Sequence, residues 1–577
     1  MLLALCVTLL LALTTAQTGN ALWPKPQSFV NGTTPLRLAP TFDIWYSPAT
    51  GRSPQEPPQD LARAMKRALG QITKDKHRRL NVERGEDDRS GVEQSVALDR
   101  LEVVLIASKV TPASISEEIN KPYSELNEAY ELSLPHDSTS GGKIAILSAN
   151  STLGLARGLQ IFTQLVYWLP GSQNEGGGEG ILYIPNSPLH VLDEPAFAHR
   201  GFMLDTSRHF YPVADILRTL ETMASVKLNV FHWHATDSQS WPLAVPAFPD
   251  LVTDSPDREG SYSAKDIDEI VEYAGGLGIS VMLEIDMPGH TASIAQSYPD
   301  YVACRDFRPW SKFSVEPPAG QLKLGDPETL EFAQRMLASS SSQFPSKYFS
   351  TGGDEINDAC YQTDPSTSAL LSANNATLND LLFKFVNGTH GTLRSVGKTP
   401  VVWEELVLGR NLPLKNDTIV LNWISSEHVK EVVERGYRII HAASNYFYLD
   451  CGLGGWLGKN SAGNSWCDPY KTWSKIYSFD PFQGLGASQY DQVLGGEALA
   501  WSEQIDPTNL DSLVWPRAAA AAEVFWSGGS LQNGSRDLGE ALSRIHDWRY
   551  RAVNRGIRAA PLQPHWCALR PGSCDLE

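Results

Sequence analysis

The chain has 577 residues and a mass of 63.4 kDa, more than a single hydrophobic core usually holds, so two or more domains are expected. Its 48 basic and 66 acidic residues give a net charge of −18, and no long Lys/Arg cluster is present, which excludes a nucleic-acid or anionic-membrane surface of electrostatic origin. Hydrophobic residues at 42% and charged residues at 20% are typical of a folded globular protein.

The first predicted element is a cleaved signal peptide, residues 1–18. An apolar run covers residues 2–13 and is followed by the small residues Thr14, Thr15 and Ala16. The run is too short to span a bilayer, and no later stretch approaches ~18 uninterrupted apolar residues. The sequence therefore predicts a secreted, extracellular protein without a membrane span.

Glycosylation triplets and cysteines agree with export. Six Asn-x-Ser/Thr triplets without a central proline are N-glycan acceptors. Six cysteines follow the signal peptide, and no C-x-x-C metal or redox motif is among them, so structural disulfides are expected. Six cysteines allow fifteen pairings, of which we expect the one that joins neighbours in sequence. The expected pairs are Cys304–Cys360, Cys451–Cys467 and Cys567–Cys574, and the acceptors are Asn31, Asn150, Asn375, Asn387, Asn416 and Asn533.

Residues 19–190 predict a smaller α+β domain. The charged segment Lys74–Arg89 has two interpretations, a solvated helix face or an exposed processing loop. The Gly-rich stretch Gly171–Gly180 predicts a surface loop. The predicted elements are the strands Leu101–Ala107 and Lys143–Leu147, the helices Gln59–Leu69 and Leu153–Leu169, and the hydrophobic run Ile181–Ile184.

From Phe197 onward, short apolar strands alternate with helical segments at the spacing of βα units. Eight such repeats over ~320 residues predict a (β/α)8 TIM barrel within residues 191–577. The predicted strands are Gly201–Leu204, Asn229–His234, Ser280–Ile285, Tyr348–Ser350, Pro400–Trp403, Thr418–Leu421, Arg438–His441 and Val493–Gly496. Predicted helices include Pro212–Val226, Ala264–Gly275, Pro327–Ser340 and a final amphipathic helix, Arg536–Arg555.

An acidic pair follows the fourth predicted strand, in the string STGGDE that ends with Asp354 and Glu355. Chemistry in a barrel lies where strands end and loops begin. Two adjacent carboxyls push one pKa up, so that one stays protonated while the other is ionised. Glycoside cleavage uses such a pair, an acid for the leaving oxygen and a negative charge for the cation.

Other charged residues stand on the neighbouring strands. Asp286 and His290, in the string EIDMPGH after the third strand, are placed to orient one another or to hydrogen-bond the acidic pair. Arg200 lies within the first strand, where an arginine is costly unless it is paired. Its planar fork suits two adjacent sugar hydroxyls.

The second strand offers a competing interpretation. His232 and His234 are two residues apart, so both side chains face the same way and form an H-x-H metal motif. A metal amidohydrolase would need further ligands, for which only His290 and His441 are suitably placed, and the acidic pair would then have no explanation.

Aromatic residues stand at the ends of the later strands, each near a carboxylate. Such a set is typical of a sugar pocket, in which C–H faces stack on rings and carboxylates accept hydroxyl hydrogens. The aromatics are Trp403, Trp423, Tyr446, Tyr448, Trp473 and Trp501, and the carboxylates are Glu404, Asp450 and Glu503.

Together these segments resemble the β-N-acetylhexosaminidases of glycoside hydrolase family 20, most closely the secreted fungal members. The matching strings, in family order, are HRGFMLDTSRHF, KLNVFHWHATDSQSWP, VMLEIDMPGH, TGGDE, VVWEE, YFYLD and GGEALAWSE. They cover residues 197–505, with weaker likeness over residues 21–184.

The resemblance implies exo-acting release of terminal GlcNAc or GalNAc from chitin oligomers or glycans, without a cofactor or metal. The mechanism would be retaining and substrate-assisted, with the substrate's 2-acetamido oxygen attacking the anomeric carbon to give an oxazolinium intermediate. Asp354 would orient and stabilise the acetamide, and Glu355 would act as general acid and then base.

The resemblance also implies roles for substrate-binding residues. Arg200 would hold the 3- and 4-hydroxyls, and Asp450 and Glu503 would lie near the 4- and 6-hydroxyls. Asp237 and His290 would support the acid. Tyr448 would hydrogen-bond the acetamide carbonyl, Trp403, Trp423 and Trp501 would wall the sugar pocket, and Trp473 would stack the next sugar.

Three further expectations come from the family. One is a zincin-like N-terminal domain without metal, with its body at residues 96–190. Another is a possible propeptide within residues 19–95, retained non-covalently, for which Lys74–Arg89 would be the processing stretch. The third is a homodimer. One departure is Ser350, where many members carry histidine, which places the hydrogen bonding beneath Asp354 in doubt.

Two more alternatives stay open from the sequence. A carbohydrate-binding protein on an inactive hydrolase scaffold would keep the tryptophans and arginine but lose an acid, whereas Asp354 and Glu355 are both present. A disaccharide-releasing enzyme of the same fold would need a longer pocket.

Overall fold

The computed structural model describes residues 21–48, 56–106, 112–135, 144–171, 180–253, 260–528 and 536–576. The predicted signal peptide, most of the Gly-rich stretch and the triplet at Asn533 lie outside these residues. Within the described ranges, no helix combines the length and apolar character needed to cross a bilayer.

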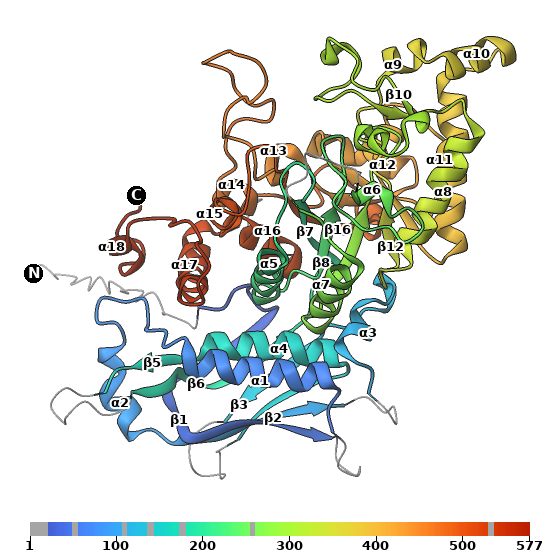
Figure 1. Ribbon diagram of the computed structural model, residues 1–577. Helices are drawn as coiled ribbons and strands as arrows, with labels where there is room; N and C mark the ends of the chain where they lie inside the picture. Colours follow the sequence, from blue (N-terminus) through green and yellow to red (C-terminus); the bar gives the residue numbers. More distant parts are fainter. Residues whose placement is uncertain are drawn as a thin grey trace, which may run out of the picture.

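Six strands form the sheet of the N-terminal domain, in the order β1-β2-β4-β3-β6-β5 (Figure 1). Residues in β3 alternate between buried and more exposed because successive side chains in a strand point to opposite faces. β1 is long enough to pair antiparallel with β6 and then parallel with β2. The strands are β1 (Ser28–Pro48), β2 (Ala97–Leu105), β3 (Tyr130–Leu134), β4 (Ile144–Ala149), β5 (Tyr167–Leu169) and β6 (Ile181–Asp193).

Helices α1 (Gln59–Lys74) and α4 (Thr152–Leu165) lie between this sheet and the barrel (Figure 1). The side chain of Ser151 caps α4 by accepting a hydrogen bond from the Gly154 N–H group. The predicted helix is too long by four residues, since its last three form β5 and pair with β6. The short helices of this domain are α2 (Arg89–Gln94) and α3 (Ile115–Ile119).

The charged segment Lys74–Arg89 is not a solvated helix face, because only its first and last residues belong to α-helices and Glu86–Asp88 form a single 3-10 turn. Arg79 donates to Asp88 at 2.8 Å, and the buried His77 ring lies 3.0 Å from Asp547 of the C-terminal helix α17 (Leu538–Asn554). The first contact lies within the segment, and the second holds the segment against α17. Proteolytic processing of this segment stays a prediction.

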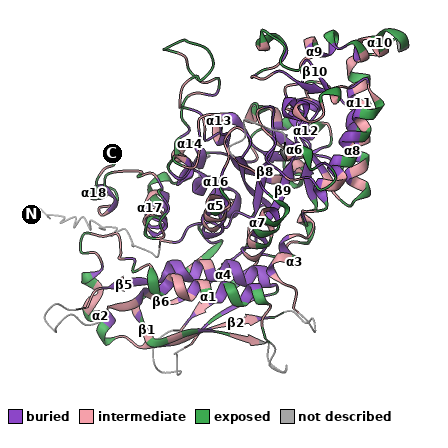
Figure 2. Ribbon diagram, in the orientation of Figure 1, coloured by how far each residue is buried: buried purple, intermediate pink, exposed green. Residues whose placement is uncertain are grey.

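Eight parallel strands close into a barrel, in the cyclic order β12-β13-β14-β15-β16-β7-β8-β9. All eight predicted strands are confirmed. Both faces of these strands are buried, so they are nearly continuous apolar runs (Figure 2). The strands are β7 (His199–Asp205), β8 (Val230–His234), β9 (Ser280–Glu284), β12 (Tyr348–Ser350), β13 (Thr399–Trp403), β14 (Ile419–Asn422), β15 (Arg438–His441) and β16 (Val493–Ala500).

Helices surround the barrel, and the predicted ones agree with the structure within one or two residues. The longer helices are α5 (Val213–Ser225), α7 (Ala264–Gly276), α8 (Pro327–Ser341), α10 (Pro365–Asn374), α11 (Leu378–Ser395), α16 (Arg517–Ser527) and α17. The short elements are α6 (Asp250–Thr253), α9 (Asp358–Thr363), α12 (Val429–Glu434), α13 (Ser444–Phe447), α14 (Trp473–Tyr477), α15 (Leu510–Val514), α18 (His565–Ala568) and the hairpin of β10 (Val302–Ala303) with β11 (Gln321–Leu322).

Buried charges join the two domains. Glu128 of the N-terminal domain accepts from Arg157 at 2.7 Å and from the barrel residue Arg200 at 2.6 Å, and all three side chains are at most 1% exposed. Lys227 of the barrel donates to Asp193 at 2.6 Å, with both side chains fully buried. Breaking such a pair leaves an uncompensated buried charge, at a cost of about 3–5 kcal/mol.

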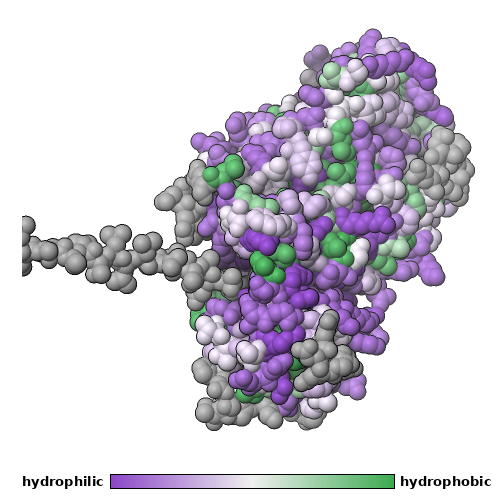
Figure 3. Space-filling model, turned by 90° about the vertical axis from the view of Figure 1, so that its left-hand side faces the viewer, coloured by the Kyte–Doolittle hydropathy of each residue, from purple (hydrophilic) through white to green (hydrophobic). Residues whose placement is uncertain are grey.

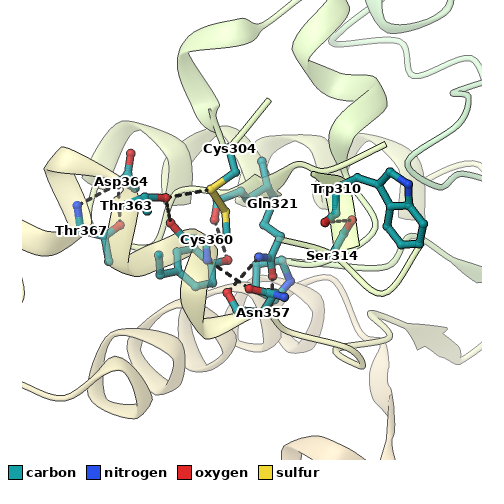
Figure 4. The surroundings of a disulfide bond; sticks show 12 residues. Cys304, Trp310, Ser314, Gln321, Asn357, Cys360, Thr363, Asp364 and Thr367 are labelled. Atoms are coloured by element: carbon teal, nitrogen blue, oxygen red, sulfur yellow. Dashed lines mark hydrogen bonds between the residues drawn. A yellow bond between two sulfur atoms is a disulfide. The ribbon is translucent and has the colours of Figure 1, made fainter. Parts of the chain in front are cut away.

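All three expected disulfides are present: Cys304–Cys360, Cys451–Cys467 and Cys567–Cys574. Figure 4 shows the first, which ties the loop after β9 to α9. Beside it, the Asn357 N–H donates to the Gln321 side chain at 2.9 Å, and Gln321 donates back to the Asn357 carbonyl at 3.1 Å. The disulfide and this bond pair therefore hold the same two segments together.

Most of the described glycan acceptors are accessible. Asn31 is half-buried in β1, and Asn150, Asn375, Asn387 and Asn416 are exposed. On the face seen in Figure 3, hydrophobic residues form small separate groups among hydrophilic ones. A surface of this kind is suited to contact with water. The glycosylation of the acceptor asparagines stays a prediction.

Candidate active site

A cavity of about 390 Å3 lies at the carboxyl ends of the barrel strands. This is the end at which barrel enzymes carry their catalytic groups. Its walls combine charged groups with aromatic rings. They are formed by Arg208, His234, Asp237, Asp286, His290, Val315, Glu316, Asp354, Glu355, Trp423, Tyr448, Asp450, Trp456, Leu457, Trp466, Trp501 and Glu503.

The turn after β12 delivers Asp354 and Glu355 into this cavity. Gly352 and Gly353 have φ angles of 58° and 97°, and a Cβ atom on Gly352 would lie 2.1 Å from the Asp286 carboxyl. Both positions therefore need glycine. Glu355 itself has a φ of 50°, a left-handed conformation that costs a non-glycine residue about 1–2 kcal/mol. Such strain is typical of functional turns.

His290 joins the acidic pair to Asp237. Its Nε2 atom lies 3.5 Å from Asp354 Oδ2 and 3.3 Å from Glu355 Oε2, and its Nδ1 atom lies 3.0 Å from Asp237 Oδ1. Although burial opposes a charged imidazole, Asp237 and Asp354 raise the pKa of His290 well above its ordinary value. His290 is therefore a cation placed between carboxylates.

Asp286 stands directly behind Asp354. Burial raises its pKa well above the ordinary range, and the charge of the neighbouring Asp354 adds to the rise, which favours the protonated form of Asp286. Its Oδ1 atom accepts from the Gly353 N–H at 2.7 Å. Burial also raises the pKa of Asp354, while His290 opposes that rise. Asp354 thus depends on His290 for its negative charge.

Ser350 does not bond Asp354. Its hydroxyl donates to Glu284 at the end of β9, and it accepts from the Gly352 N–H at 3.3 Å. Ser350, where the chain departs from the family pattern, therefore bonds groups beneath the acidic pair and not the pair itself.

Three predicted aromatic residues line the cavity. The rings of Trp423 and Tyr448 are stacked, with centroids 6.0 Å apart, and Trp501 lies 6.2 Å from Tyr448. Glu405 fixes one wall, because it accepts from the Trp423 indole N–H at 2.7 Å and from the Glu355 backbone N–H at 3.4 Å. Trp423 and Trp501 directly follow β14 and β16, so the ends of these strands position the aromatic walls of the cavity.

The expectation for the other two tryptophans is wrong. Trp403 is 1% exposed and lies behind Trp501, with ring centroids 6.1 Å apart, so it supports the wall without lining it. Trp473 belongs to α14, where its ring lies 6.1 Å from Tyr477, and it does not reach the cavity.

Trp456 and Trp466 line the mouth of the cavity, although the sequence argument did not select them. Trp466 is 66% exposed and packs edge-on against Trp423 at 5.5 Å. Both tryptophans lie in the loop closed by Cys451–Cys467. A short disulfide-closed loop that carries exposed aromatics between two barrel strands, β15 and β16, was the signal that could have identified them.

The predicted sugar-binding role of Arg200 is contradicted by its place in the barrel. Arg200 is the second residue of β7, at the amino end of the strand, where it is fully buried against Glu128. The cavity instead holds Arg208, which lies 3.1 Å from Asp205 and 3.0 Å from Asp237 and also pairs with Glu316. Arg208 follows the carboxyl end of β7, which is the end that carries the site.

Asp450 and Glu503 face the cavity as predicted. Burial raises the pKa of Asp450 to about 7 and raises that of Glu503 well above its ordinary value. Asp450 Oδ1, Asp354 Oδ1 and the Trp501 indole N–H are buried atoms without a hydrogen-bond partner in the protein. Buried polar atoms normally have partners, so this converging set suits a polar ligand with several hydroxyl or amide groups.

The H-x-H pair of β8 does not have the geometry of a metal site. His232 faces Glu497 and Glu284 with its two ring nitrogens, at 2.9 and 3.1 Å. His234 faces Glu284 and Asp237, at 2.6 and 2.8 Å. These carboxylates raise the pKa values of His232 and His234 to about 10 and about 9 against the effect of burial. A charged imidazole donates from both nitrogens and offers no lone pair to a metal.

Comparison with known proteins matches both parts of the chain. Residues 197–529 match the model of the glycosyl hydrolase family 20 catalytic domain, and residues 22–165 match a domain described as beta-acetyl hexosaminidase like.

Among curated proteins, a beta-hexosaminidase of Arthroderma benhamiae is 38% identical over 78% of this chain and 74% of its own length. A chitooligosaccharidolytic beta-N-acetylglucosaminidase of Bombyx mori is 33% identical over 78% and 75%. A solved structure of Flavobacterium johnsoniae chitobiase superimposes with a TM-score of 0.70 at 26% identity, covering 93% of this chain and 73% of that one.

Proposed function

The chain belongs to glycosyl hydrolase family 20 and is a β-N-acetylhexosaminidase, and from this premise we propose how its own residues carry the reaction. We propose that it removes terminal non-reducing β-linked GlcNAc or GalNAc by a retaining, substrate-assisted mechanism. The 2-acetamido oxygen of the substrate attacks the anomeric carbon, and an oxazolinium intermediate forms and is hydrolysed.

In this proposal Asp354 and Glu355 have different catalytic roles. Asp354 accepts from the acetamide N–H and stabilises the positive charge that develops on the oxazolinium ring. Glu355 protonates the leaving oxygen and then accepts a proton from the water that opens the ring. Their common neighbour His290 supports this division, since its positive charge favours an ionised Asp354 and its Nε2 atom also contacts Glu355 at 3.3 Å.

The other cavity groups recognise the sugar. Arg208 replaces Arg200 as the proposed partner of the 3- and 4-hydroxyls, with Asp450 and Glu503 near the 4- and 6-hydroxyls. Tyr448 donates to the acetamide carbonyl, and Trp423 and Trp501 enclose the acetamide and the sugar ring. Trp466 takes over from Trp473 as the proposed platform for the next sugar.

One observation carries the proposal: two adjacent carboxyls of different environment meet a single imidazolium inside a cavity walled by aromatic rings. A carbohydrate-binding remnant would have no need to keep the left-handed turn at Glu355 or the charged His290. The H-x-H metal alternative would need His232 and His234 as ligands. Their ring nitrogens are already paired with Glu284, Asp237 and Glu497.

Hydrolysis of an aryl β-N-acetylglucosaminide by the purified protein tests the mechanism. We expect cleavage that EDTA does not reduce, that a thiazoline mimic of the intermediate stops, and that is nearly lost on the matching β-glucoside, which lacks the acetamide nucleophile. Comparable turnover of the β-glucoside would overturn substrate assistance, and loss of activity in EDTA would restore the metal alternative.

Separate substitutions of the two arginines should distinguish sugar binding from folding. We expect Arg208→Lys to lower kcat/KM about tenfold, because lysine lacks the two-pronged fork. Arg200→Lys should leave KM unchanged and lower the free energy of unfolding by about 2 kcal/mol, since it weakens the buried bond to Glu128. Steady-state kinetics and urea unfolding of both variants measure this, and a KM effect confined to Arg200→Lys would reinstate the sequence-based assignment.

The biological setting follows the relatives. We propose chito-oligosaccharides as substrates, because the Bombyx mori relative is described as chitooligosaccharidolytic. Secretion is proposed from the signal-like segment and the three disulfides. A homodimer and a retained propeptide from residues 19–95 remain proposals, which sedimentation of the secreted protein and sequencing of its N-terminus test.

A further inference from the structure

A chain of buried acidic and histidine side chains leads from the active site into the barrel. His290 contacts Asp237 at 3.0 Å, and Asp237 contacts His234 at 2.8 Å. His234 contacts Glu284 at 2.6 Å, and Glu284 contacts His232 at 3.1 Å. Apart from His290, whose side chain is 9% exposed, these side chains are at most 1% exposed.

The chain continues to the N-terminal domain. His232 contacts Glu497 at 2.9 Å, Glu497 contacts His199 at 3.0 Å, and His199 contacts the Tyr123 hydroxyl at 2.7 Å. Tyr123 lies in a short 3-10 turn before β3. We refer to His232, His234, Glu284 and Glu497 as the buried column.

Hydrogen-bond geometry fixes the charges in the column. His232 and His234 each direct both ring nitrogens at carboxylates, and a neutral imidazole has only one N–H to donate. Both are therefore imidazolium ions, in agreement with their raised pKa values. The histidines in turn lower the pKa values of Glu284 and Glu497, against the effect of burial. Positive and negative charges thus alternate along the column.

Buried histidines elsewhere in the barrel region provide an internal comparison. His441 on β15 bonds only the Pro481 carbonyl, at 2.9 Å, and burial lowers its pKa to about 4. His390 on α11 contacts Thr351 and has its pKa lowered to about 3, again chiefly by burial. At His441 and His390 burial thus lowers the pKa, whereas at His232 and His234 carboxylates on both ring nitrogens raise it.

We propose that His232, His234, Glu284 and Glu497 are positioning residues, which act through Asp237 to hold His290 charged and oriented toward Asp354 and Glu355. This inference rests on the proposed roles of Asp354 and Glu355. Asp237 is fully buried and needs cations on its free edges, which Arg208 and His234 supply. His234 also contacts Glu284, and Glu284 in turn contacts His232 and the Ser350 hydroxyl.

Other titratable groups also face His290 or Asp354. These groups are left unchanged in every variant of the test. Asp286, Glu316, Glu405 and Tyr448 face His290 or Asp354. Glu284 is itself among the charges that raise the pKa of Asp354, which shows that the column charge is felt at the active site.

The test uses the sign of a pH shift. His232→Gln removes a positive charge, which should raise the pKa values of the catalytic carboxyls and move both limbs of the kcat/KM pH profile to higher pH. Glu284→Gln removes a negative charge and should move both limbs to lower pH. We expect shifts of about half a pH unit in opposite directions, with KM changed less than about twofold because neither residue lines the cavity.

The double variant His232→Gln/Glu284→Gln removes one charge of each sign. Its profile should return to that of the wild type, even if its stability is lower than that of either single variant. The matched control is His441→Gln, which changes a buried histidine on β15, a barrel strand that does not adjoin β8 or β9, and should not move the profile. Should Glu284→Gln fail to fold, Glu497→Gln removes the next negative charge and carries the same expected sign.

Three outcomes overturn the inference: shifts of equal sign in the two single variants, no shift in folded variants, or failure of every column variant to fold while His441→Gln folds. The last outcome would confine the column to stability. Glu355→Gln separates this inference from the proposed function. If Glu355→Gln stays active, the catalytic assignment is wrong, whereas an inactive Glu355→Gln with unshifted column variants refutes the column alone.

Discussion

Glu355→Gln should lower kcat on chito-oligosaccharides by at least about 10². The amide has nearly the shape of the acid but no proton to give to the leaving sugar oxygen. On an activated aryl glycoside the loss should be much smaller, since a phenolate leaves without protonation. Steady-state kinetics on both substrates measure the difference.

The difference between the kcat losses on the two substrates tests the role of Glu355 as the acid. Equal losses on both would show that Glu355 is not the acid and that its substitution disturbs the site as a whole. Glu434→Gln is a suitable control, because that glutamate is more than half exposed on α12 and pairs only loosely with Lys430, at 3.8 Å. Its kinetics should equal those of the wild type.

Asp354→Asn should also lower kcat by about 10² or more, because a neutral amide cannot stabilise the positive charge of the oxazolinium ring. The loss should be similar on aryl and sugar leaving groups, which distinguishes it from the loss in Glu355→Gln. Binding of a thiazoline mimic should weaken in parallel with kcat. Inhibition constants measured against an aryl N-acetylglucosaminide test this.

Unchanged thiazoline binding would refute the acetamide role of Asp354. The matched control is Asp358→Asn, four residues further along the chain at the first position of α9. The Asp358 side chain is 53% exposed and contacts Arg410 at 2.6 Å outside the cavity. Because it lies close to Asp354 in the chain but outside the cavity, it separates local structural disturbance from loss of the Asp354 charge.

The barrel could be predicted from the sequence because its strands are buried on both faces. A strand such as Ile419–Asn422 is apolar up to its last residue, and the turn residues that separate such runs mark their ends. The carboxyl ends then indicate the site, and the choice of Asp354, Glu355, Trp423, Tyr448 and Asp450 as cavity residues follows from that rule.

The misassigned residues depend on information that no local pattern carries. Arg200 and Arg208 stand at opposite ends of one strand, and only the strand direction relative to the cavity decides between them. The long strand β1 contains Pro35 and Pro40, which argue against a strand by propensity. It forms because tertiary pairing with β2 and β6 outweighs local preference.

The contact of Arg200 and Arg157 with Glu128 has a consequence for the dissection of this enzyme. A shortened chain that contains the barrel alone would keep the Arg200 and Lys227 cations in its base and lose the Glu128 and Asp193 carboxylates that neutralise them. We therefore expect neither domain to fold on its own, and the two to melt in a single cooperative transition. The catalytic barrel is therefore expected to depend for its stability on an N-terminal domain that contributes no residue to the cavity.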